Sequence, residues 1–159
     1  MESAEILQTV AEIAMGLAGF GGIAAGLGYR SSGVWSDDDQ GRLIGMAYTS
    51  LLVVFAGLLP FVVHNLGIVV PWRVSAMIVL PFQVLNLAGT LRVYRHGISK
   101  THSLIASILL VLVHSATVGV LAVICLNLYV GSHFGLYLLS LMVILIAAAM
   151  LFARLLVTS

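Results

Sequence analysis

Long apolar stretches separated by short polar linkers dominate the pattern of this chain. Five stretches reach the roughly 20 residues that a membrane-spanning helix needs, at about residues 6–28, 43–63, 70–91, 103–126 and 134–157. Lipid offers the backbone no hydrogen-bond partner, so these stretches are expected to be helices. None alternates polar and apolar residues over ten positions, as a membrane β-barrel requires. The pattern predicts an all-α, multi-pass integral membrane bundle of five transmembrane helices, forming a single domain over residues 1–159.

An alternative remains for the first stretch, which could lie at the membrane surface and leave four spanning helices. An interfacial helix needs a strongly charged face. The stretch is apolar enough to enter a bilayer and carries few charges, so five spans are the preferred interpretation.

The composition favours the same environment. Of the 159 residues, 61% are hydrophobic and 8% are charged, whereas soluble domains carry roughly a quarter charged residues. The expected surroundings are therefore the lipid bilayer. The net charge is +1 and no basic run is interleaved with aromatic residues, so nucleic-acid binding is not expected. The single cysteine, Cys125, excludes an intrachain disulfide and a cysteine-based metal cluster.

The basic residues divide unevenly between the two sides of the predicted bundle. With five spans, only Arg73 falls on one side. The other six Lys and Arg residues fall on the opposite side: Arg30, Arg42, Arg92, Arg95, Lys100 and Arg154. Basic residues that flank membrane spans stay in the cytoplasm. This predicts an N-terminus outside and a C-terminus in the cytoplasm.

The chain resembles many short multi-pass proteins of bacteria, so a bacterial inner membrane is the expected location. No motif identifies a family.

The first predicted helix has distinct faces when its residues are placed about 100° apart. One stripe is polar or small and contains Glu5, Gln8, Glu12, Gly16 and Gly19. A second stripe contains the small residues Ala14, Ala18, Gly22 and Gly26. Small residues at this spacing let helix backbones approach closely, so the second stripe is predicted to pack against another helix. Ionisable residues within spans are costly and often functional; alternatively, Glu12 reaches the headgroups or pairs with a neighbour.

Several polar residues are expected at the outer end of the bundle. They are Glu5, Glu12, His64, Arg73 and His133. Our hypothesis is that they form an outward-facing polar vestibule, with a Glu12–Arg73 or Glu–His contact at its centre. The alternative is five independent residues at the membrane interface.

Polar residues also occur inside the other predicted spans. Gln83, Asn86 and Thr90 share one helix face, and His114 lies near the middle of the fourth span. Lipid offers these groups no partner, so they should face the bundle interior. Together with Glu12, the residues Gln83, Asn86 and His114 are candidates for an ion pathway. The alternative is that they form hydrogen bonds that hold helices together.

Further features of the spans bear on structure and chemistry. Pro60 and Pro81 each free a backbone carbonyl within a span. His133, Tyr137 and Ser140 share one face of the fifth span. Facing histidines could bind haem, but no spacing motif supports it. The HExxH and GxSxG motifs are absent, as are paired intramembrane carboxylates at a metal-binding spacing. The only lysine, Lys100, lies in a predicted loop, so no lysine within a span is present to bind retinal. We therefore expect no enzyme activity, no metal and no cofactor.

Two functions remain open. The first is a small oligomeric channel, transporter or transporter subunit that moves a small ion or proton. The second is a non-catalytic subunit, anchor or sensor that packs against partner membrane proteins, with the basic loop at residues 92–102 as a surface for a partner or anionic lipid. A pore needs continuous polar lining, and the inner half of the bundle offers only Thr90 and Ser107.

Overall fold

A computed structural model describes residues 2–32, 37–95 and 104–158. Over these residues the chain consists of helices and short turns, without strands. The five helices are α1 (Glu2–Ser32), α2 (Asp37–Asn65), α3 (Pro71–Arg95), α4 (Leu104–Cys125) and α5 (His133–Thr158). Each contains a segment long and apolar enough to cross a membrane. The prediction of an all-α, multi-pass membrane protein with five helices is confirmed.

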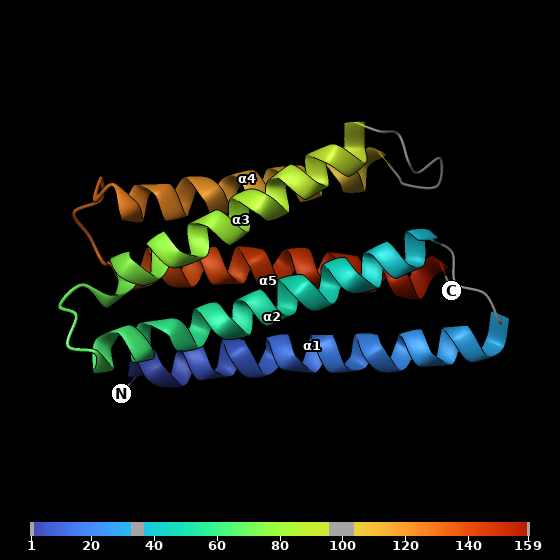
Figure 1. Cartoon of the computed structure of the whole chain (residues 1–159), viewed down its shortest axis with the longest axis horizontal. Coiled ribbons are helices and arrows are strands. Elements are labelled where there is room, and N and C mark those ends of the chain that lie inside the picture. Colours follow the sequence, from blue (N-terminus) through green and yellow to red (C-terminus); the bar gives the residue numbers. More distant parts are fainter. Residues whose placement is uncertain (1, 33–36, 96–103, 159) are drawn as a thin grey trace.

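The helices run up and down along a common direction (Figure 1). The N-terminus, the α2–α3 connection and the α4–α5 connection lie at one end of the molecule, and the C-terminus lies at the other. Helix α1 runs beside α2, so the first apolar stretch belongs to the bundle and does not form a separate surface helix. Successive helix connections thus lie at alternating ends of the bundle, as the assignment of the basic residues to two sides assumed. Which end faces the cytoplasm stays a prediction.

Helices α2 and α5 form the centre of the bundle. Helix α1 packs against both of them, and α3 and α4 form a pair that packs against their other side. Within the described ranges, α1 contacts neither α3 nor α4. Residues of all five helices form the buried core, among them Leu7, Val53, Val79, Leu121, Leu141 and Ile144. Along the spans, this layering separates the outward face of α1 from the contact between α3 and α4.

Helices α2 and α4 end in the same kind of tight turn. The amide of Gly67, with φ of 79°, donates to the carbonyl of His64 at 2.9 Å. The amide of Ile68 donates to the carbonyl of Val63 at 3.4 Å. This hydrogen-bond pair is the Schellman motif, which needs a left-handed residue after the helix. Asn127, with φ of 55°, takes that position after α4. The two turns bring the next helices back into the bundle within a few residues.

A proline in α2 is compensated from another helix. Pro60 has no N–H group, so the carbonyl of Ala56 loses its usual partner one turn later. The hydroxyl of the fully buried Tyr137 on α5 donates to this carbonyl at 2.7 Å. The hydroxyl of Ser140 in turn donates to the carbonyl of Tyr137 at 2.6 Å. The carbonyl that Pro60 was expected to free thus becomes a link between α2 and α5.

Candidate functional site

Three of the four pathway candidates lie together between α3 and α4. The amide nitrogen of Gln83 is 2.9 Å from Nδ1 of His114, and these side chains are 0% and 3% exposed. The amide of Asn86 donates to the side-chain oxygen of Gln83 at 3.4 Å. Because the Gln83 nitrogen can only donate, Nδ1 of His114 accepts and the proton of the neutral ring lies on Nε2. The cluster is a buried hydrogen-bond network joining two helices.

Glu12 lies apart from this cluster. It faces the exposed side of α1 and accepts a hydrogen bond from Gln8 at 2.8 Å. Helix α1 does not contact α3 or α4 over the described residues. Within a single copy of the chain, Glu12 is therefore not in contact with the other three candidates. Interhelical hydrogen bonds in membranes contribute about 1 kcal/mol each. Within a single chain, the buried cluster is therefore suited to holding α3 against α4.

The expected contact between Glu12 and Arg73 is not formed within the chain. No ion pair joins these two residues in the part of the chain that the structure describes. Arg73 instead donates from Nε to the carbonyl of Cys125, the last residue of α4, at 3.0 Å. A cation at this position satisfies a carbonyl without a helical partner and faces the negative end of the helix dipole. Glu5, the other predicted acidic member of the cluster, is also exposed on α1.

The small-residue stripe of α1 divides between two environments. Ala14 is fully buried and Ala18 is partly buried. Gly22 and Gly26 are exposed, and a Cβ added at either would meet no atom within 4 Å. The stripe therefore packs within the chain only at its first half. Its second half points outward, where it stays a predicted packing surface for another chain.

Other small residues make the close contacts within the bundle. At Gly57 of α2, an added Cβ would lie 3.4 Å from the carbonyl oxygen of Leu7 and 3.6 Å from Cβ of Ala11. On α1, the buried Gly21 faces the side chain of Met46. The α1–α2 contact thus depends on glycines that the stripe of α1 does not include.

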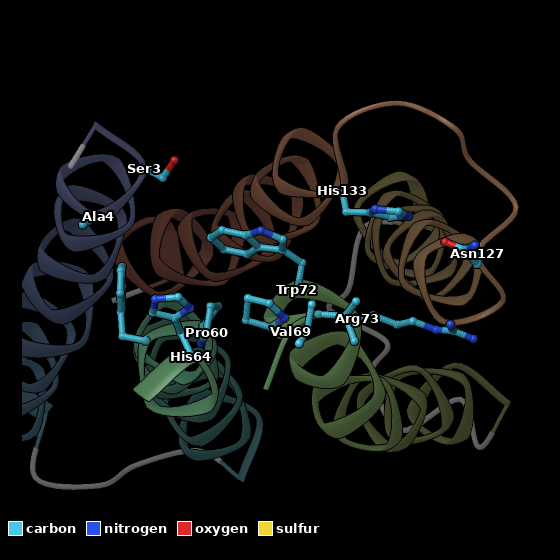
Figure 2. Close-up of a pocket in the computed structure, with 12 residues that line it drawn as sticks. Ser3, Ala4, Pro60, His64, Val69, Trp72, Arg73, Asn127 and His133 are labelled. Carbon is cyan, nitrogen blue, oxygen red and sulfur yellow. The ribbon is translucent and has the colours of Figure 1, made fainter. Parts of the chain in front are cut away.

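A pocket of about 650 Å³ opens at the end that carries the α2–α3 and α4–α5 connections (Figure 2). His64, Arg73 and His133 line it, so three of the five predicted outer polar residues share one pocket. Glu5 and Glu12 are not among its lining residues. The remaining lining residues come from α1, α2, α3 and the two connections: Ser3, Ala4, Pro60, Phe61, Val69, Val70, Pro71, Trp72 and Asn127.

The pocket has a polar side and an apolar side. Figure 2 shows Arg73, Asn127 and His133 toward α4, with His64 on the α2 side and Trp72 between them. The Trp72 ring packs against the rings of Phe134 and Tyr137, with centroids 5.1 and 6.0 Å away. Nε2 of His133 is enclosed and has no hydrogen-bond partner in the described structure. The sequence pattern did not single out Trp72 or Asn127 for this site.

Within the described ranges, no group of three or more His, Cys, Asp or Glu side chains is placed to hold a metal ion. Comparisons of the chain with protein families, with curated proteins and with solved structures find no match. The fold defines the class of this chain as a small multi-pass membrane protein with five helices. Its function must be argued from its own residues.

Proposed function

We propose that copies of this chain assemble through the outward face of α1, and that a small cation or proton passes along the interface past Glu12. One observation carries the proposal. Glu5, Gln8 and Glu12 lie on the exposed side of a helix whose apolar segment, Ser3–Ala24, is long enough to span a membrane. A polar stripe in this position faces lipid as long as the chain is alone.

The exposed stripe is unfavourable in lipid. A charged carboxylate at the centre of a spanning helix costs up to about 3 kcal/mol on insertion scales. Covering the stripe with protein and hydrogen-bond donors removes much of this cost. The carboxylate of Glu12 already accepts one hydrogen bond from Gln8. This makes a protein-covered interface the stable arrangement.

A second copy of the chain fits this face. The amide of Gln8 carries two N–H groups, and one of them donates to Glu12 in its own chain. Rotational symmetry places identical residues next to one another, so the second N–H of Gln8 can reach the Glu12 of a neighbour. The open positions at Gly22 and Gly26 let the two backbones approach closely farther along the helix.

Transport follows if several copies surround a central axis. Rings of acidic side chains select cations in many channels, and a carboxyl group can bind and release a proton when its surroundings change its pKa. Glu12 would form such a ring, with Gln8 as its hydrogen-bond donor. Gly16 and Gly19 continue the stripe without filling the space near the axis.

A second candidate is a non-transporting subunit that uses the same face to bind a different membrane protein. The observation in its favour is the second half of α1. Gly22 and Gly26 leave space for a neighbouring helix there, but they add no polar side chain that could line an ion path. The interior polar residues Gln83 and His114 already hydrogen bond to each other. In this case Glu12 would anchor the partner helix.

The substitution Glu12→Gln separates these functions. The wild type and the variant would be reconstituted in liposomes, and proton, sodium and potassium fluxes would be measured under imposed gradients. We expect Glu12→Gln to keep the oligomeric state, because the amide retains its shape and hydrogen bonds. We expect flux to fall by at least about tenfold, as for the loss of a charged site worth 1.4 kcal/mol or more. Oligomeric state would be measured by native mass spectrometry.

The substitution Glu5→Gln is the matched control, because it removes a carboxylate from the same stripe nearer the start of α1. It is expected to change flux much less than Glu12→Gln. A wild type that is oligomeric but passes no ion under any gradient would contradict transport and leave the subunit function. A wild type that stays monomeric in lipid nanodiscs and binds no other membrane protein would contradict both.

A further inference from the structure

We propose that the pocket at the end of the bundle binds an amphiphile with an oxyanion headgroup, a phosphate or a carboxylate. The pocket lies between the start of α1, the end of α2 and the two connections. It does not include the outward stripe of α1. The proposal is therefore independent of the proposed assembly through Glu12.

The polar lining of the pocket offers hydrogen-bond donors and no carboxylate. Its polar side chains are Ser3, His64, Arg73, Asn127 and His133. The guanidinium of Arg73 uses Nε on the carbonyl of Cys125. Its two terminal nitrogens form the planar fork that matches a phosphate or carboxylate. The amide of Asn127 lies on the same side of the pocket (Figure 2) and can add a further donor.

The ends of two helices reinforce this preference for an anion. Helix α3 begins at Pro71 and α5 begins at His133, and both residues line the pocket. The start of a helix carries a partial positive charge and backbone amides without helical partners. Helix N-termini are therefore common binding sites for phosphate and carboxylate groups.

An unsatisfied polar atom points to the same side. Nε2 of His133 is enclosed without a hydrogen-bond partner in the described structure. A buried polar atom without a partner costs about 1–3 kcal/mol. A rotation of the imidazole ring that turns Nε2 toward the pocket would let an oxyanion bound beside Arg73 provide this partner. The unsatisfied atom thus lies on the side of the pocket that the cation and the helix ends favour for an anion.

The apolar lining indicates that the headgroup is attached to an apolar body. Phe61, Val69, Val70 and the Trp72 ring contribute apolar walls. Val69 and Val70 are exposed although they lie beside membrane-spanning segments. The pocket volume of about 650 Å³ lies in the range of sites for organic ligands, about 300–1,000 Å³. An isolated phosphate ion would leave most of this space unfilled.

Trp72 provides a direct measurement, because the chain has only one other tryptophan, Trp35. The full-length Trp35→Phe variant in neutral detergent would be titrated while its fluorescence is recorded. The probes are dihexanoyl phosphatidic acid, hexyl phosphate, dihexanoyl phosphatidylcholine and inorganic phosphate. We expect saturable changes with the first two, at least about tenfold tighter than with the last two. The tighter of the first two tells whether the natural source is a lipid or a soluble amphiphile.

The side chains that form the pocket are tested in the same assay. Arg73→Gln should weaken binding by at least about tenfold, the loss expected for a charge-assisted hydrogen bond. Because Arg73 also contacts α4, Asn127→Gly is a second test. Glycine adopts φ of 55° without strain and removes only the amide side chain, so severalfold weaker binding is expected. Arg92→Gln removes an exposed cation outside the pocket lining and should change nothing.

Three results would overturn the proposal. Equal binding of phosphatidylcholine, whose phosphate charge is balanced by the choline cation, would rule out recognition of a headgroup with net negative charge. Equal binding of inorganic phosphate would rule out the apolar body. Wild-type affinity in both Arg73→Gln and Asn127→Gly would show that the pocket does not hold the probe.

Discussion

At the scale of single residues, the hydroxyl of Tyr137 matters because Pro60 leaves a carbonyl without its helical partner. The substitution Tyr137→Phe removes only the oxygen that donates to Ala56. An unsatisfied carbonyl in a buried site costs about 1–3 kcal/mol. We expect the free energy of unfolding to fall by about this amount. Titration with a denaturing detergent, followed by the fluorescence of the neighbouring Trp72, would measure it.

The background Pro60→Ala tests whether the proline is the cause. Alanine restores an N–H group that can donate to the carbonyl of Ala56 within α2. In this background Tyr137→Phe should be much less destabilising than in the wild type. Equal losses in the two backgrounds would mean that Tyr137 stabilises the bundle only through packing.

For single residues, the sequence predicted which polar side chains face the interior but not which of them are in contact. Periodicity correctly placed Gln83 and His114 toward the interior, because lipid offers their polar groups no partner. It could not pair them. The contact between Gln83 and His114 depends on how far α3 is shifted along α4, and the pattern of one helix says nothing about this shift.

At the scale of helices, the α1–α2 contact depends on Gly57, whereas Gly22 faces outward. The substitution Gly57→Val would place branched carbons against the carbonyl of Leu7, which is 3.4 Å from an added Cβ. Overpacking of this kind costs about 1–3 kcal/mol. We expect Gly57→Val to lower the thermal unfolding temperature of the purified protein, measured by the loss of folded protein on heating.

The substitution Gly22→Val is its matched counterpart, since an added Cβ there meets no atom within 4 Å. It should leave the unfolding temperature of the single chain nearly unchanged. If copies assemble through α1, it should weaken that assembly in mass photometry. Loss of monomer stability in Gly22→Val, or none in Gly57→Val, would contradict this division of roles.

The faces of α1 show why helix packing was only partly predictable. Helical spacing grouped Ala14 with Gly22 and Gly26, but only Ala14 is fully buried, whereas the two glycines are exposed. It also grouped Glu12 with Gln8, and these two side chains form a hydrogen bond. Which part of each stripe turns inward depends on where α2 and α5 lie. The buried residues Leu7, Val10 and Ala14 face those helices, and this rotation leaves Glu12 on the outside. Because α2 and α5 lie between α1 and α3, the expected contact with Arg73 was out of reach.

At the scale of the whole molecule, the pocket and the distribution of basic residues distinguish the two ends. The end with the pocket carries Arg73, which lines the pocket and donates a hydrogen bond to the last carbonyl of α4. The sequence placed His64, Arg73 and His133 at this end because the loops of spanning helices must alternate. It could not predict a shared pocket, since the lining also depends on the tight turns at Gly67 and Asn127. Alternation defines the ends, and tertiary packing forms the site.

The bias in basic residues makes the orientation of the molecule testable. Cys125→Ser would first remove the native cysteine. Val130 lies in the α4–α5 connection and Gln40 lies near the start of α2, which are at opposite ends of the molecule (Figure 1). Both positions are exposed, so the single-cysteine variants Val130→Cys and Gln40→Cys would report on the two ends. Moving the six Lys and Arg residues of the other end across the membrane opposes the positive-inside preference. An impermeant maleimide added to intact cells should therefore label Val130→Cys, and should label Gln40→Cys only after permeabilisation. The reverse pattern would place the pocket in the cytoplasm and limit its ligands to cytoplasmic or inner-leaflet amphiphiles.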